Sequence, residues 1–174
     1  MIRAATPDDA VALAGVQHRA WWRAYADYVD PERFKTLEEL VARWHELLAP
    51  AAGRRRATLV FDQSRQVAGF ATFGPARDDD ATPQTGELMA VYVDPPAQGA
   101  GVGRALLDAA DARLREQGFP EVVVWVFAAN AMARELYERR GWVLDPSTSP
   151  ARQGSAGGPA VDWWAPAVRY RRRL

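Results

Sequence analysis

Residues Glu121 to Phe127 read Glu-Val-Val-Val-Trp-Val-Phe, and all but the first are apolar. A continuous apolar run of this length, rich in β-branched and aromatic residues, is typical of a strand that is buried on both faces. Such a strand needs a packing layer on each side, which an α/β domain supplies by placing helices against a sheet. The run therefore favours an α/β fold with a central strand at 121–127.

Apolar spacing, cap residues and turn residues predict the other elements. Thr6-Pro7-Asp8-Asp9 is typical of a helix start, because it combines a capping threonine, an early proline and two carboxylates at the positive end of the helix dipole. A second helix is predicted to start at Pro31 and to end before Pro50. Two more helices are expected at 101–117 and 130–140, and strands at 2–4, 57–61, 67–73, 86–93, 121–127, 142–144 and 161–174.

The resulting order is β-α-α-β-β-β-α-β-α-β-β, with four helices and a mixed central sheet of about seven strands. The length of 174 residues suits one domain, so we expect residues 1–174 to form a single domain. Segments 74–85 and 146–159 are rich in Pro, Gly, Asp and Ser. We expect both to be loops, the first of them mobile.

Composition excludes several classes of function. The chain has 22 basic and 22 acidic residues, and this balance argues against a dedicated nucleic-acid binder. It has no cysteine, which excludes disulfides, thiolate metal sites and a cysteine nucleophile. Two histidines are too few for a histidine metal site unless carboxylates supply the other ligands. No apolar run approaches membrane-spanning length and no leader pattern is present. We therefore expect a cytoplasmic protein without a bound metal or a membrane partner, and a homodimer stays open. The basic run 171–173 is interpreted as a solvated terminus.

The strongest chemical signal is the segment Gln98-Gly99-Ala100-Gly101-Val102-Gly103 between a predicted strand and a predicted helix. Glycines there let the backbone approach a bulky anion, and the first N–H groups of the helix point at it. The segment lacks the Gly-Lys-Ser/Thr ending of a Walker loop and the spacing of a dinucleotide fingerprint. These observations predict a pyrophosphate site, although an ordinary strand-to-helix turn could carry the same glycines.

Two motifs resemble the GNAT superfamily of N-acetyltransferases. Residues 87–107, Glu-Leu-Met-Ala-Val-Tyr-Val-Asp-Pro-Pro-Ala-Gln-Gly-Ala-Gly-Val-Gly-Arg-Ala-Leu-Leu, look like its acetyl-CoA-binding motif. Residues 130–142, Asn-Ala-Met-Ala-Arg-Glu-Leu-Tyr-Glu-Arg-Arg-Gly-Trp, look like the motif that follows it in that family. The element order also matches over nearly the whole chain. The resemblance implies the GNAT fold, acetyl-CoA as cosubstrate, and direct acetyl transfer to a primary amine of a small amine, a peptide N-terminus or a lysine side chain.

The resemblance also implies a cofactor-binding set. The pyrophosphate would be held mainly by backbone N–H groups, and the pantetheine arm would pair with the main chain of the preceding strand. From the sequence alone, Val91 and Val93 could equally be core residues, and both interpretations can hold. The residues that the resemblance assigns to acetyl-CoA, besides Asn130, are Val91, Tyr92, Val93, Gln98, Gly99, Ala100, Gly101, Val102, Gly103 and Arg104.

Asn130 and Tyr137 are seven helical positions apart. Seven positions turn an α-helix by about 700°, so the two side chains lie within roughly 20° of one face. In the family such an asparagine contacts the pantetheine and such a tyrosine protonates the departing thiolate, a role that suits a phenol with a pKa near 10. The alternatives are a simple helix cap for Asn130 and a packing aromatic for Tyr137.

Similar enzymes place a proton-accepting carboxylate where this chain has Glu87, often acting through water. The alternative is a surface glutamate at a strand end, in which case Asp27, Asp30, Asp162 or a water chain could serve. We find no Ser-His-Asp arrangement, so we expect no acyl-enzyme.

Aromatic residues occupy both segments that frame the acceptor in the family. Aromatic walls beside carboxylates suit a cationic amine with an apolar body, although each ring could instead be core packing. Two other functions stay open: transfer of a different acyl group or to a hydroxyl, and a non-catalytic CoA-binding module. The aromatic residues are Trp21, Trp22, Tyr25, Tyr28, Trp163 and Trp164.

Overall fold

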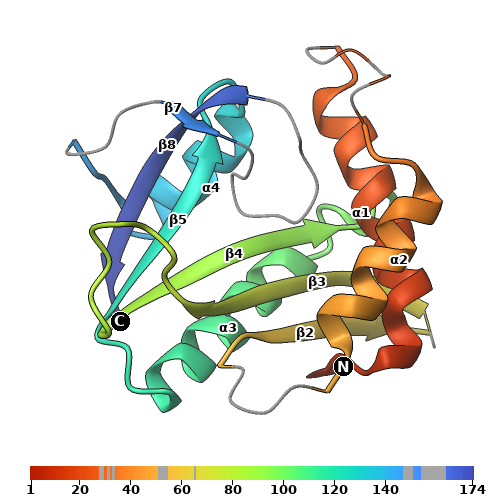
Figure 1. The fold of residues 1–174 in the computed structure, drawn as a ribbon, viewed down its shortest axis with the longest axis horizontal. Helices are drawn as coiled ribbons and strands as arrows, with labels where there is room; N and C mark the ends of the chain where they lie inside the picture. The colour runs from red at the N-terminus through yellow and green to blue at the C-terminus, as the bar shows by residue number, and fades with distance from the viewer. Residues whose placement is uncertain are drawn as a thin grey trace.

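The computed structural model describes residues 1–27, 30, 32, 34–50, 55–64, 66–146, 151–153 and 164–174, with only the backbone at 151–153, 164 and 165. It has four α-helices and a mixed sheet, as expected from the sequence (Figure 1). The helices are α1 (Ala10–Tyr25), α2 (Leu37–Leu48), α3 (Val102–Glu116) and α4 (Ala131–Arg139). The strands are β1 (Ile2–Ala4), β2 (Ala57–Gln63), β3 (Gln66–Pro75), β4 (Thr85–Val93), β5 (Glu121–Phe127), β6 (Val143–Leu144), β7 (Ala151–Gln153) and β8 (Trp164–Arg173).

The strands follow the order β1-β2-β3-β4-β5-β8-β6, and the short β7 pairs with β8 beside this path. The β4–β5 pair is parallel, and every other pair is antiparallel. The predicted central strand 121–127 therefore lies between β4 and β8, where its side chains from Val122 to Phe127 are buried. The fold class predicted from the sequence is confirmed.

Two apolar clusters cover opposite faces of the sheet. On one face α3 and Tyr137 of α4 pack against Ala71, Phe73 and Leu88. On the other face α1 and α2 pack against Phe70 and Ala90. Along β3 this alternation follows from the strand period of two, which sends neighbouring side chains to opposite faces. Along β4 the register shifts at Met89, between Leu88 and Ala90, so these two residues face opposite sides although they are two positions apart.

The second helix begins at Leu37, so the prediction that it starts at Pro31 is wrong. Thr36 caps the helix: the Glu39 N–H donates to Thr36 Oγ1 at 3.2 Å, and the Thr36 N–H donates to Glu39 Oε2 at 2.7 Å. This reciprocal pair is a capping box, which satisfies two N–H groups at the start of a helix. The sequence Thr-Leu-Glu-Glu carries that signal, and it outweighs the proline that we took as the start.

The loop after β3 is tied to the sheet rather than left free. Asp78 Oδ2 and Asp80 Oδ2 lie 3.0 and 2.6 Å from guanidinium nitrogens of Arg169, whose side chain is buried in β8. The expectation of a mobile loop overlooked this partner, because an arginine nearly ninety residues away gives no local sequence signal. None of the helices in the described part of the chain has the length and apolar composition that crossing a membrane takes.

Candidate active site

The sheet opens between β4 and β5. These strands pair only from Thr85 and Glu121 to Leu88 and Val124, after which β5 continues along β8 and β4 continues along β3 (Figure 1). The β3–β4 register skips Met89, which is a β-bulge, and bulges bend a strand. The main chain of residues 89–93 consequently has no strand partner, among the described residues, on the side that faces the opening.

Val91, Tyr92 and Val93, which the family resemblance assigns to the pantetheine arm, lie on this unpaired part of β4. The side chains of Val91 and Val93 pack against the core, so they also have the structural role that the sequence left open. An unpaired strand edge presents backbone N–H and C=O groups at regular spacing. Such an edge is suited to a ligand that carries amides and no side chains.

The glycine segment follows directly on this edge. Gly99 and Gly101 have φ angles of 79° and 81°, a backbone conformation that favours glycine. Gly101 is the N-cap of α3 and offers no side chain to its first turn, and residues 98–101 are exposed. The helix therefore presents uncapped N–H groups and the positive end of its dipole to solvent, which is the arrangement of an anion site.

The side chains around this segment differ in their contacts. Gln98 Nε2 donates to the Val93 carbonyl at 3.2 Å, so its side chain touches the end of the unpaired edge. The side chain of Val102 is buried in the core and that of Arg104 is largely exposed. Ala100 and Gly103 complete the predicted segment, and their contribution to a ligand would come from the main chain.

Asn130 lies on the opposite side of the opening, where it caps α4. Its Oδ1 accepts from the Ala133 N–H at 3.0 Å, and its Nδ2 donates to the Tyr25 hydroxyl at 2.7 Å. The capping role predicted as the alternative is thus present, and the amide also contacts α1. Tyr25 packs on Phe127 with ring centroids 5.1 Å apart, and burial raises the pKa of its phenol to about 12.

Tyr137 is buried beside Trp142, with ring centroids 5.4 Å apart. Burial, and secondarily the neighbouring phenol of Tyr25, raise the pKa of Tyr137 above its ordinary value. Its hydroxyl donates no hydrogen bond to any residue that the structure describes. The packing role is therefore confirmed, and no residue in the described part of the chain accepts the proton of the phenol.

Glu87 is completely buried, so the interpretation as a surface glutamate is wrong. Arg77 Nη2 donates to Glu87 Oε1 at 2.7 Å and Arg77 Nε donates to Oε2 at 2.9 Å. This bidentate pair raises the pKa of Arg77, mainly through its hydrogen bonds to Glu87. Sequence reasoning missed Arg77, since it lies across a loop from the carboxylate that it binds.

The aromatic residues on the acceptor side gather around Trp21. Its Nε1 donates to the Tyr92 hydroxyl at 2.8 Å, and its ring contacts Tyr25 and Phe127 at centroid distances of 4.8 and 5.6 Å. Trp21 is thus core packing and also a wall of the opening. Asp27 and Asp30 are exposed. Tyr28, Asp162 and Trp163 lie outside the described residues, as does the side chain of Trp164.

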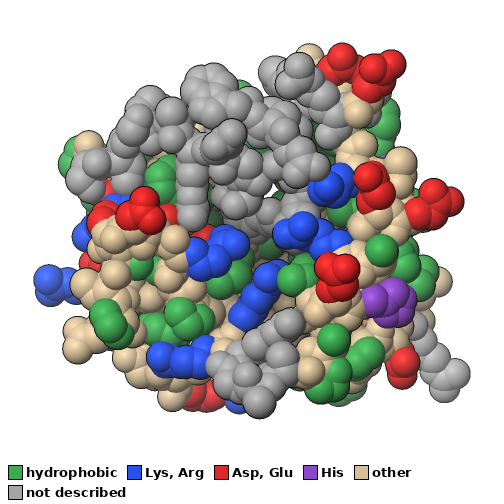
Figure 2. All heavy atoms as spheres, viewed as in Figure 1, with side chains coloured by type: hydrophobic (Ala, Val, Ile, Leu, Met, Phe, Trp, Pro, Cys, Tyr) green, Lys and Arg blue, Asp and Glu red, His purple; other side chains and the backbone are tan. Residues whose placement is uncertain are grey.

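A buried cluster of charged side chains, which the sequence analysis did not predict, lies on the same face of the sheet as Trp21. Arg169 binds Asp78, Asp80 and Asp145, and Trp125 Nε1 donates to Asp78 at 3.0 Å. Arg171 also binds Asp145 on this face, whereas Arg172 binds Asp111 of α3 at 2.5 Å on the opposite face. The interpretation of 171–173 as a solvated terminus is therefore wrong for Arg171 and Arg172, while Arg173 is exposed. Lys and Arg side chains also gather near the middle of the face seen in Figure 2.

The comparisons with known proteins agree with this geometry. A model of the acetyltransferase (GNAT) family matches residues 18–142, and the chain belongs to this family. It is 34% identical over 139 residues to the mycothiol acetyltransferase of Thermobispora bispora, covering 75% of this chain and 45% of that one. The chain thus spans about half the length of the mycothiol acetyltransferases it matches.

Two solved structures that resemble the chain contain coenzyme A or acetyl-CoA. The PaiA N-acetyltransferase of Thermoplasma acidophilum, in complex with coenzyme A, has a TM-score of 0.75 at 16% identity and covers 100% of this chain and 98% of its own. The acetyltransferase YncA of Salmonella typhimurium, with acetyl-CoA, has a TM-score of 0.69 at 25% identity and covers 100% and 93%.

Proposed function

We propose that the chain transfers an acetyl group from acetyl-CoA directly to a primary amine. The observation that carries this proposal is the unpaired edge of β4 next to the uncapped start of α3. The two features fit two chemically different parts of one molecule. The edge matches the amides of pantetheine, and the N–H groups of the helix match the pyrophosphate.

Tyr137 would supply the proton that the departing thiolate needs. Its raised pKa keeps the phenol protonated at ordinary pH, and no described residue takes its proton. During transfer the amine nitrogen bonds to the acetyl carbon and the carbon–sulfur bond breaks. The Tyr137 proton then goes to the sulfur, which leaves as the thiol.

Glu87 would accept the proton that the amine loses. Both of its oxygens contact Arg77, so we expect the proton to arrive through a water molecule. Arg77 would act as a positioning residue that holds the carboxylate in place. Asn130 and Tyr25 would orient the pantetheine arm, since their hydrogen bond lies on the far side of the opening from β4.

Two measurements test the proposal separately. Calorimetry should show acetyl-CoA binding to the protein, and a spectrophotometric thiol assay should show release of CoA when amines are added. The panel should include small amines, peptides with a free N-terminus, a lysine peptide and acceptors related to mycothiol. No acetyl-CoA binding at millimolar concentration would overturn the proposal. Tight binding with no transfer to any acceptor would favour a non-catalytic CoA-binding module.

A further inference from the structure

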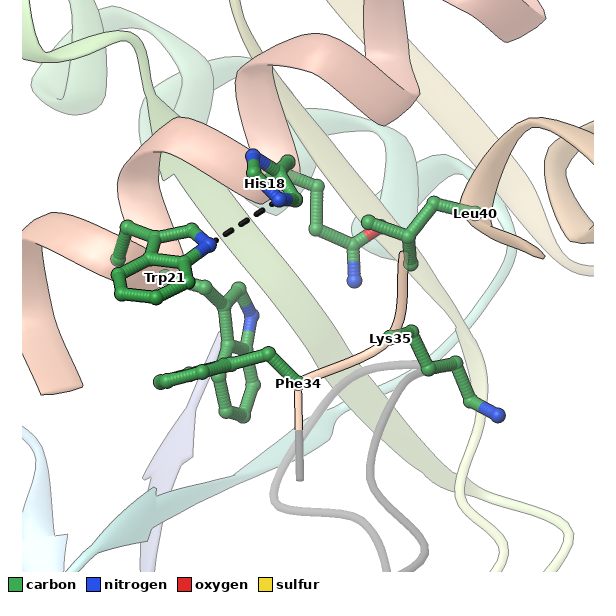
Figure 3. Close-up of a pocket in the computed structure, with 7 residues that line it drawn as sticks. His18, Trp21, Phe34, Lys35 and Leu40 are labelled. Atoms are coloured by element: carbon green, nitrogen blue, oxygen red, sulfur yellow. Dashed lines mark hydrogen bonds between the residues drawn. The ribbon is translucent and has the colours of Figure 1, made fainter. Parts of the chain in front are cut away.

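A narrow hollow lies between α1 and the segment that leads into α2 (Figure 3). It has space of about 10 Å³, enough for one water-sized group. Trp22 is 37% exposed, and His18, Phe34 and Lys35 are partly exposed, so the hollow reaches the surface. Its lining residues are Gln17, His18, Trp21, Trp22, Phe34, Lys35 and Leu40.

The deepest polar group of the hollow is the side-chain amide of Gln17, which is completely buried. Its Oε1 accepts from Trp44 Nε1 at 2.8 Å. Because an indole N–H can only donate, this contact fixes which end of the amide is oxygen. The Nε2 end has no hydrogen-bond partner among the described residues. A buried donor without a partner is unusual in proteins, and the missing acceptor is often water or a ligand.

His18 also lines the hollow, and its acceptor nitrogen is already occupied. His18 Nε2 accepts from Trp22 Nε1 at 3.1 Å, so the proton of a neutral imidazole lies on Nδ1. Burial, and secondarily Arg19, lower the pKa of His18 and favour this neutral form. No carboxylate lines the hollow, and the lining atom without a partner among the described residues is the Gln17 Nε2 donor. Such a donor selects an oxygen with lone pairs.

The remaining walls are flat and apolar. The rings of Trp22 and Phe34 are stacked with centroids 4.9 Å apart, and Trp21 stands edge-on to Phe34 at 6.3 Å. Trp21 also forms a wall of the opening between β4 and β5 through its contacts with Tyr25 and Tyr92. Trp21 therefore borders both the hollow and the candidate active site.

We propose that the hollow binds a carbonyl-type oxygen of the acceptor, which makes the acceptor an amine with an amide or carboxylate group and an apolar body. Gln17 Nε2 donates to that oxygen, and the aromatic rings contact the apolar part beside it. Amines that lack the oxygen leave the buried donor unpaired and are poorer acceptors. This inference rests on the proposed acetyl transfer to amines.

The test compares matched acceptors of two lengths on the parent protein. The short set is phenylalanine, phenylalaninamide and phenethylamine, and the long set is 6-aminohexanoate, 6-aminohexanamide and hexylamine. We expect kcat/KM to be at least about tenfold higher for an oxygen-bearing member than for the plain amine in one set, the size of one hydrogen bond. A higher kcat/KM for the acid than for the amide would identify the bound group of the acceptor as a carboxylate. Equal values for both would identify it as an amide-type oxygen. Values within about twofold across both sets would overturn the inference, since one hydrogen bond is worth more.

Gln17→Glu ties the preference to this hollow. The substitution keeps the size of the side chain and an oxygen for Trp44, and it removes the Nε2 donor. We expect the ratio of kcat/KM for the oxygen-bearing amine to kcat/KM for the plain amine to fall to near one. An unchanged ratio would overturn the inference. Gln66→Glu makes the same change at an exposed position of β3 and should leave the ratio as in the parent. If Gln17→Glu does not fold, Gln17→Met removes the same donor, and an unchanged ratio in that variant would overturn the inference.

Calorimetry separates this inference from the proposed function. The same acceptors are titrated into the protein saturated with CoA, with no turnover required. Selective binding of the oxygen-bearing amines without transfer to any of them would support the inference about the hollow and count against the proposed acetyl transfer. Transfer to amines with no discrimination in rate or binding would support acetyl transfer and overturn the inference about the hollow.

Discussion

The two sides of the opening present different kinds of chemical group. The side made by β4 and the start of α3 offers main-chain groups: an unpaired strand edge, two glycines with positive φ, and uncapped helix N–H groups. The side under α1 and β8 offers side chains: Trp21, the Arg77–Glu87 pair and the Arg169 cluster. Main-chain recognition tolerates much sequence change, so it suits a cosubstrate shared by a whole family. Side-chain recognition changes with every substitution, so it suits an acceptor that differs between members.

The largest expected effect tests the main-chain side. Gly101→Asp should reduce acetyl-CoA binding below detection, because it puts a negative charge beside the phosphate site and a Cβ at a φ of 81°. Calorimetry at millimolar acetyl-CoA measures this. Ala112→Asp adds the same charge at an exposed position further along α3 and should bind as the parent does. Equal binding of acetyl-CoA by both variants would contradict this prediction, because the glycine segment would then not be the anion site.

Tyr137→Phe should lower kcat by roughly 10² to 10⁴ and leave acetyl-CoA affinity nearly unchanged, because it removes only the proton donor. The raised pKa of Tyr137 also sets the sign of the pH dependence. The donor is present below that pKa and is lost above it, so the parent should not lose activity from this group up to about pH 10, the ordinary tyrosine value. A Phe variant with parental kcat on a confirmed acceptor would remove Tyr137 from the mechanism.

Glu87→Gln tests the side-chain half of the site. We expect kcat/KM to fall by roughly 10- to 100-fold near neutral pH, at the low end of what an acid–base group contributes. The deficit should shrink at high pH, where more of the acceptor is already a free amine. Steady-state rates between pH 7 and 10 measure both effects. Thermal melting beside the parent is the control, because the substitution also removes the charge that pairs with Arg77. A deficit that stays constant with pH would assign Glu87 a structural role.

The smallest effect tests a contact between α1 and α4. The Tyr25 hydroxyl of α1 accepts from Asn130, which caps α4 across the opening from β4. Tyr25→Phe should weaken acetyl-CoA binding by roughly 2- to 10-fold, the value of one neutral hydrogen bond, and leave the preference among acceptors unchanged. Calorimetry and the acceptor sets together measure this. A changed acceptor preference with parental acetyl-CoA affinity would place Tyr25 on the acceptor side alone.

Local signals in the sequence predicted the parts that depend on neighbours along the chain. The apolar run at 121–127 predicted the central strand, and the glycines at 99 and 101 predicted the turn into α3. The asparagine at 130 predicted the start of α4, where its side chain caps the helix. Propensity, periodicity and caps act over a few residues, so a single sequence contains them. The assignment of acetyl-CoA contacts to these residues stays a prediction.

Tertiary structure alone decided the long-range partners. The sequence could not show that Glu87 is buried against Arg77, that Asp78 and Asp80 bind Arg169, or that Tyr25 meets Asn130. Nor could it show that Trp44 fixes the amide of Gln17 and leaves its donor unpaired. Each of these contacts forms only after separate segments of the chain have packed together. The free energy of a buried charge or donor depends on what surrounds it, and that environment exists only in the folded chain.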